Sequence, residues 1–72
     1  MNPKEILRVE RYLRERFQMR TIGLKRRKGQ DDSVEVYIEE EFIGVLFRDE
    51  EDGEVSYQFQ MAILSEDLPP ES

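Results

Sequence analysis

The spacing of hydrophobic residues changes once along the chain, and the first stretch has the period of a helix. Four apolar residues recur every three or four positions and share an arc of about 80° on a helical wheel. Asn2 is a favourable N-cap, Pro3 suits the first helical position, and Glu5 follows Asn2 at the spacing of a capping box. We therefore predict one amphipathic helix over residues 3–17, with Leu7 exposed on its basic side. The buried stripe would consist of Ile6, Val9, Leu13 and Phe17.

After residue 17 the hydrophobic period shortens to two, as in strands that bury one face. Four alternating runs follow, and the last turn holds Gly53 as in a three-residue hairpin loop. We predict an α+β fold, in which one N-terminal amphipathic helix packs on a four-stranded antiparallel β-meander (α-β-β-β-β). The predicted strands are Thr21–Arg27, Val34–Glu39, Phe42–Asp49 and Val55–Leu64, with a polar loop at Lys28–Ser33 and a tight turn at Glu40-Glu41.

The length of 72 residues allows one domain with a small core. We expect this domain to occupy residues 1–64. Residues 65–72 are acidic and contain two prolines, and we expect them to form a disordered tail.

The register of the predicted sheet decides which side chains share a face, because a shift of one residue reverses every side chain. The predicted turns give one register in which all the inward residues agree. The predicted pairs are Ile22 with Ile38, Leu24 with Val36, Lys25 with Glu35, Ile38 with Ile43, Val36 with Val45, Val45 with Phe59 and Phe47 with Tyr57.

In this register the sheet face away from the helix carries a small apolar patch of Tyr37, Phe42 and Leu46. Apolar patches on small proteins tend to be partner or dimer surfaces. Tyr37 also lies between Gly23 and Gly44, so covering weak strand positions is an equally simple interpretation of that residue. The first functional hypothesis is a non-enzymatic protein-interaction module that docks through this face, with another protein or a second copy as the partner.

The net charge of −6 conceals two halves of opposite sign. Residues 1–28 hold ten basic and three acidic residues, a net charge of +7, and residues 29–72 hold one basic and fourteen acidic residues, a net charge of −13. A basic helix face together with the 25–28 cluster could bind RNA or a ribosomal surface, and this is the alternative hypothesis. Against it, no aromatic residues are interleaved, and the cluster continues into two aspartates. The candidate residues are Arg8, Arg11, Arg14, Lys25, Arg26, Arg27 and Lys28.

The composition excludes several kinds of chemistry. The chain has no Cys and no His, so it lacks thiol nucleophiles, thiolate or imidazole metal ligands, and a serine triad. The acidic run around Gly53 fails as an EF-hand, because Arg48 and Phe59 would stand at the first and twelfth positions. We expect no enzyme activity, no cofactor and no bound metal. No run is apolar enough to span a membrane, and we expect a soluble, cytoplasmic protein.

Several stretches of the chain carry a resemblance to a known family. They are MNPKEI at residues 1–6, VYI at 36–38, EFIGVLFRD at 41–49, and DG at 52–53 followed by SYQFQMAIL at 56–64. Together they resemble a family of short bacterial proteins that carries only a domain-of-unknown-function label. The resemblance implies a free-standing small bacterial protein and implies no activity. The second hairpin turn of that family contains Gly, whereas Glu39-Glu40-Glu41 stands here, so the turn type is left open.

Overall fold

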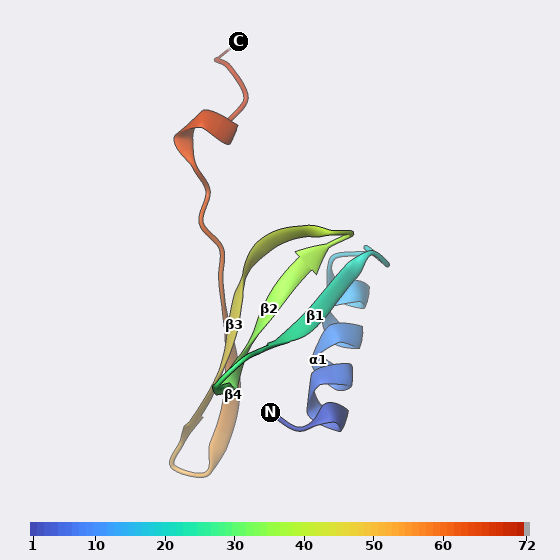
Figure 1. The fold of residues 1–72 in the computed structure, drawn as a ribbon, viewed down its shortest axis with the longest axis vertical. Coiled ribbons are helices and arrows are strands. Elements are labelled where there is room, and N and C mark those ends of the chain that lie inside the picture. The colour runs from blue at the N-terminus through green and yellow to red at the C-terminus, as the bar shows by residue number, and fades with distance from the viewer. Residues whose placement is uncertain (72) are drawn as a thin grey trace.

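The computed structural model describes residues 1–71, which form one helix followed by a single antiparallel sheet (Figure 1). The strands are neighbours in chain order, so the sheet is the meander that the sequence predicts, and the α+β class is confirmed. Ser72, the last residue of the predicted tail, lies outside the described residues. The elements are α1 (Pro3–Arg16), β1 (Ile22–Arg27), β2 (Gln30–Ile38), β3 (Glu41–Glu51), β4 (Glu54–Gln60) and a 3-10 turn, η1 (Ser65–Asp67).

The start of α1 is capped as its sequence indicates. The side chain of Asn2 accepts a hydrogen bond of 2.7 Å from the backbone N–H of Glu5, which satisfies one of the free donors of the first turn. At the other end the prediction fails for Phe17, which is the C-cap and is 54% exposed rather than buried. The chain leaves the helix through Gln18, which has a φ of +51°, and this turn carries Phe17 away from the core.

The core lies between α1 and the helix-facing side of the sheet, and α1 runs alongside β1 (Figure 1). Two helix side chains also bond to the backbone of β1. Glu10 Oε2 accepts from the N–H of Leu24 at 3.0 Å, and Arg14 Nε donates to the carbonyl of Ile22 at 2.7 Å. The buried apolar residues are Leu13, Ile22, Val34, Val36 and Leu46.

The β1–β2 hairpin has the predicted register, with Ile22 opposite Ile38 and Lys25 opposite Glu35. The loop between the strands is shorter than predicted. β2 already begins at Gln30, and only Lys28 and Gly29 form the turn. Gly29 has a φ of +75°, a conformation that glycine adopts without steric cost.

The β3–β4 hairpin differs from the prediction by one residue. Its turn has two residues, Asp52 and Gly53, with φ values of +54° and +81°. This is the type I′ pattern that Asp-Gly favours, and it matches the twist of the two strands. Arg48 therefore lies opposite Tyr57, whereas Phe47 was the predicted partner.

A second irregularity lies between β2 and β3. The turn consists of Glu39 and Glu40, and the register shifts between Val36 and Tyr37, so that Ile43 is left without a partner as a β-bulge. Val36 consequently lies opposite Gly44 rather than Val45. The predicted inward set of β3 is wrong for Val45 and Phe47 for this reason, because these two point outward and the inward residues beyond the bulge are Gly44, Leu46 and Arg48. Ile43, the third predicted inward residue, still packs against the core.

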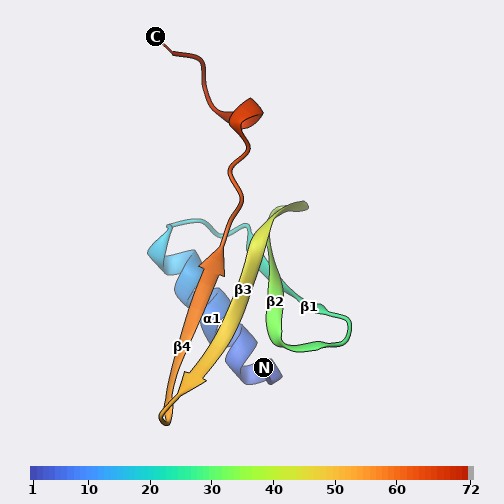
Figure 2. The same cartoon turned by 90° about the vertical axis from the view of Figure 1, so that its left-hand side faces the viewer.

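β4 ends at Gln60, whereas the alternating pattern predicts a strand to Leu64. Beyond the bulge β3 bends away from β4, and the chain after Gln60 continues past the sheet without a strand beside it (Figure 2). The two strands are close where they still pair. A Cβ atom at Gly44 would overlap the carbonyl oxygen of Gln60 and lie 2.7 Å from Cε1 of Phe59.

The β2–β3 turn offers a test of backbone strain. Glu39 has a φ of +57°, a conformation that costs an L-residue roughly 1–2 kcal/mol, whereas Glu40 does not have a positive φ. We expect Glu39→Gly to raise the free energy of unfolding by up to about 1 kcal/mol, after the entropic cost of glycine in the unfolded chain. Glu40→Gly is the matched control and should lower it. Chemical denaturation of both variants measures the difference, and equal effects would contradict the turn geometry.

Candidate functional site on the helix-distal sheet face

The sheet face away from α1 carries a row of stacked side chains that crosses three strands. The rings of Tyr37 on β2 and Phe42 on β3 meet edge to face, with centroids 5.7 Å apart and an interplanar angle of 74°. On the β1 side, Nζ of Lys25 lies 4.3 Å from the centroid of the Tyr37 ring, within cation–π range. The row therefore runs from a cation on β1 to an aromatic ring on β3.

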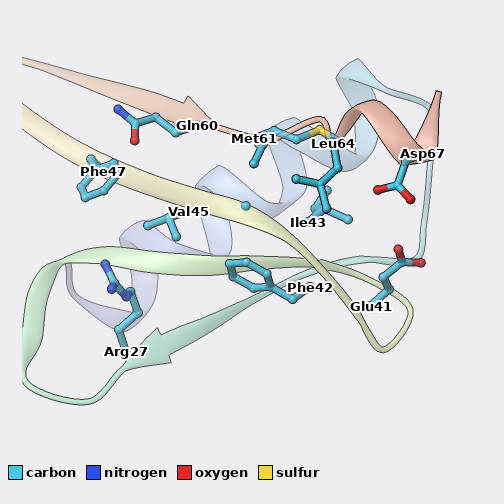
Figure 3. A pocket seen from close by; sticks show the side chains of 12 residues that line it. Arg27, Glu41, Phe42, Ile43, Val45, Phe47, Gln60, Met61, Leu64 and Asp67 are labelled. Atoms are coloured by element: carbon cyan, nitrogen blue, oxygen red, sulfur yellow. The ribbon is translucent and has the colours of Figure 1, made fainter.

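This face also contains a groove of about 670 Å³ along β3 (Figure 3). Its floor is apolar, with Val45 and Phe47 on the strand and Phe42 beside them, and its ends are charged. Arg27 lies at one end, and Glu41 with Asp67 at the other. The chain after β4 forms one wall of the groove through Met61, Ala62 and Leu64.

Two of the three predicted interface residues lie at this site. Tyr37 and Phe42 are in contact on the distal face, and Phe42 is 50% exposed. Leu46 is not part of the site, because the one-residue shift of β3 turns it into the core, where it is 2% exposed. Val45 and Phe47 take its place on the distal face, and the Asp-Gly dipeptide after β3 is the sequence signal that would have indicated them.

Polar contacts hold the border of the distal face. The Tyr37 hydroxyl donates a hydrogen bond of 3.0 Å to the Glu35 carboxylate, and this bond raises the pKa of Tyr37 above its ordinary value. Nη1 of Arg27 donates to Oγ of Ser33 at 3.0 Å, and Ser33 is buried. Because the bond to Ser33 holds the Arg27 side chain in place, the groove has a defined cationic end.

The seven basic candidate residues do not form one surface. Lys25 and Arg27 lie on the distal face, whereas the helix residues lie on the opposite side of the sheet. Arg11 and Arg14 form i,i+4 ion pairs with Glu15 and Glu10, at 3.2 and 3.3 Å. Arg8 lines a different groove, between α1 and β4. Arg26 pairs with Val34 at the edge strand and is exposed, and Lys28 lies in the β1–β2 turn.

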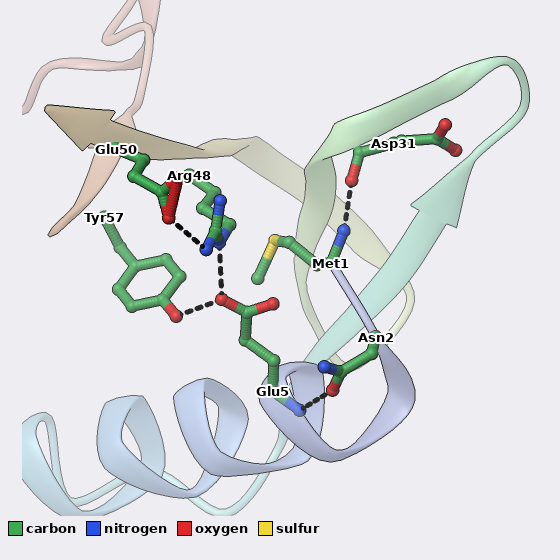
Figure 4. A network of polar contacts seen from close by, with 7 residues as sticks. All are labelled: Met1, Asn2, Glu5, Asp31, Arg48, Glu50 and Tyr57. Atoms are coloured by element: carbon green, nitrogen blue, oxygen red, sulfur yellow. Dashed lines mark hydrogen bonds and ion pairs between the residues drawn. The ribbon is translucent and has the colours of Figure 1, made fainter. Parts of the chain in front are cut away.

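A polar cluster that sequence reasoning missed connects α1 to the far strands (Figure 4). Oε2 of Glu5 accepts from Nε of Arg48 at 2.8 Å and from the Tyr57 hydroxyl. Nη2 of Arg48 also contacts Glu50 Oε2 at 3.1 Å. The Tyr57 hydroxyl first, and then Arg48, hold the pKa of Glu5 below its ordinary value near 4.5, against the partial burial that would raise it. The partners of the Glu5 carboxylate lie on β3 and β4, so the cluster attaches α1 to these two strands.

Within residues 1–71, no group of three or more acidic side chains is arranged to hold a metal ion. Across the same residues, α1 is the longest helix, and its fourteen residues are too few and too polar to cross a membrane.

A family model for proteins of unknown function, DUF3126, matches residues 5–67 of the chain. The match covers all four strands and most of α1, and the chain belongs to this family. No curated protein and no solved structure matches it.

The Glu5 cluster predicts how stability depends on pH. The folded pKa of Glu5 lies below its unfolded value, so its contribution is complete above about pH 4.5 and is lost as the pH falls through the folded pKa. Glu5→Gln should lower the free energy of unfolding by about 1 kcal/mol at pH 7 and should flatten its decrease below pH 4.5. Denaturation between pH 7 and 2.5 measures both effects.

Glu15→Gln is the control for this measurement, because the Glu15–Arg11 pair is exposed on the outside of α1. It should change the free energy of unfolding by less than about 0.5 kcal/mol. Parallel pH profiles for wild type and Glu5→Gln would show that the cluster does not hold the helix.

Proposed function

We propose that this protein is a non-enzymatic interaction module, and that its distal groove binds an apolar segment of another protein. A cytoplasmic location and a bacterial source, both expected from the sequence, are part of the proposal. The observation that carries it is the apolar floor of the groove, which is built from Phe42, Val45 and Phe47 on the side of the sheet that no helix covers. An exposed apolar surface with a polar border is typical of protein-binding sites.

The charges at the groove ends indicate how a partner would be oriented. Arg27 stands at one end, and Glu41 and Asp67 stand at the other, roughly along β3. A partner segment with an acidic residue at one end and a basic residue at the other would match both. Such charges favour one orientation and speed encounter more than they add affinity. Lys25 and Tyr37 continue the surface toward β1 and would form its border.

Binding to RNA or a ribosomal surface is the alternative, and the geometry supports it less. A phosphate backbone needs several cations on one surface, whereas Arg8, Arg11 and Arg14 lie on the other side of the sheet from Lys25 and Arg27. Two of the three helix arginines are already paired with glutamates. We expect no binding of single-stranded RNA at low salt, which a fluorescence-anisotropy titration would check.

Phe42→Asp tests the proposed groove. The side chain is half exposed, so the substitution should leave the fold intact and place a charge on the apolar floor. Affinity capture from the native cell, followed by titration of the purified partner, should show at least about a tenfold loss of affinity.

Leu7→Asp is the matched control, because Leu7 is 63% exposed and lies on α1, on the other side of the sheet. It should retain full affinity for the captured protein. If Phe42→Asp and Leu7→Asp bind the partner equally well, the groove is not the binding site.

A further inference from the structure

The strand β4 is an open edge of the sheet, and after its first residue, Glu54, no charged side chain protects it. Residues 55–64 form ten consecutive positions without Asp, Glu, Lys or Arg, in a chain that is 39% charged. β4 pairs with β3 on one side, and among the described strands none lies on its other side. Edge strands normally carry charges, prolines or bulges that prevent pairing with another chain. This edge has none of them over the length of the run.

The other edge strand, β1, is protected in two ways. It carries Lys25, Arg26 and Arg27, and helix side chains bond to two of its backbone groups. Glu10 accepts from the N–H of Leu24, and Arg14 donates to the carbonyl of Ile22. One edge strand of this sheet, β1, is therefore protected against pairing with another chain, whereas the other, β4, is not.

The helix also leaves the β4 side of the core incompletely covered. Because α1 lies against β1, a groove of about 470 Å³ remains between α1 and β4. Tyr12, Tyr57 and Phe59 line it, and Tyr12 is 61% exposed. Val55 in β4 and Ile63 beyond its end are exposed as well. A strand added along β4 would place its side chains at the mouth of the groove.

We propose that two copies of this protein pair antiparallel along β4, around a two-fold axis at Phe59, to form one continuous eight-stranded sheet. In this register every helix-side pair is apolar: Val55 with Ile63, Tyr57 with Met61, and Phe59 with Phe59. On the distal side Ser56 meets Ala62, and Gln58 meets Gln60, so no pair contains a charge. β4 would extend from Gln60 to Ile63, one residue short of the strand Val55–Leu64 that the alternating pattern of the sequence predicts.

The charges of the chain favour an antiparallel over a parallel arrangement of the two copies. The β3–β4 turn is strongly acidic, with Asp49, Glu50, Glu51, Asp52 and Glu54 around it. Antiparallel pairing keeps the two acidic turns more than roughly 30 Å apart, at about 3.4 Å per residue, which exceeds the Debye length of about 8 Å. Parallel pairing would set them side by side. The contact uses the same strand in both copies, so it closes as a dimer rather than a fibre.

This interface shares Met61 and Ala62 with one wall of the distal groove but uses no residue of its floor, and it does not rest on the proposed function. Sedimentation velocity from micromolar to millimolar concentration should show a monomer–dimer equilibrium for the wild type. Val55→Glu and Ile63→Lys should each weaken the dimer about tenfold or more, because each places an unpaired charge opposite an apolar residue in two symmetric pairs. The double variant should recover the wild-type dissociation constant, because the carboxylate introduced at position 55 of each copy would then face the ammonium group introduced at position 63 of the other.

Two control variants separate this proposal from the proposed function. Leu68→Lys places the same charge on a residue that is 57% exposed but lies outside the pairing run, and it should leave the dimer unchanged. Phe42→Asp should also leave it unchanged. A wild type that stays monomeric to millimolar concentration overturns the proposal. So does a dimer that Phe42→Asp dissociates while Val55→Glu and Ile63→Lys do not, or a double variant that fails to recover.

A distance measurement checks the register without relying on altered stability. The chain has no cysteine, so Ser56→Cys gives a single site for a spin label. In the proposed register the two Ser56 positions are separated by about six residues along the ladder, or roughly 20 Å. Pulsed electron–electron double resonance should show a single distance distribution centred near that value, with a width set by the flexibility of the label side chains. A broad distribution, or one beyond about 40 Å, would contradict the register.

Discussion

The register of β3 against its two neighbours is the constraint on which the rest of the molecule depends. Successive side chains of a strand point to opposite faces, so the position of each turn decides which residues the core receives. The Asp52-Gly53 turn sets β4 against β3, and the bulge at Ile43 allows the same β3 to pair with β2. Together they bury Leu46, expose the distal aromatic surface, and turn Arg48 toward the helix.

An acidic residue from the basic half of the chain pairs with a basic residue from the acidic half, and this pair joins the two halves. Glu5 is one of three acidic residues in the basic half, and Arg48 is the one basic residue in the acidic half. They form an ion pair of 2.8 Å in which the Glu5 side chain is 15% exposed, far less than the 69% of Glu15 in its pair with Arg11 on α1. The majority charges remain at the surface, where they interact weakly and keep the molecule hydrated. The attachment of the helix therefore rests on few ionic contacts.

Sequence patterns predict this fold wherever only one set of positions in an element, one helix stripe or one alternating set of a strand, is apolar. The helix, the four strands and the β1–β2 register follow from local alternation, and the placement of Tyr37 and Phe42 on the distal face follows with them. β3 is different, because both of its alternating sets contain large apolar residues: Ile43, Val45 and Phe47 in one, Phe42 and Leu46 in the other. Only the turn and the bulge decide between them, and the compositional signal of the bulge is a single residue, Gly44, which follows Ile43 in the strand. Contacts between distant residues, such as Glu5 with Tyr57, are likewise absent from any local pattern.

The bulge at Ile43 also bears on how the length of this segment can vary. Replacing a side chain in β3 changes one contact, and removing the bulged residue Ile43 would leave the other pairs of β3 in place. Inserting or deleting one residue between Gly44 and the Asp52-Gly53 turn, with the bulge and both turns kept, would instead bring the register of β3 against β2 into conflict with its register against β4. The stretch from Gly44 to Glu51 can therefore diverge in residue type far more freely than in length, because it keeps a fixed spacing between the bulge and the second turn.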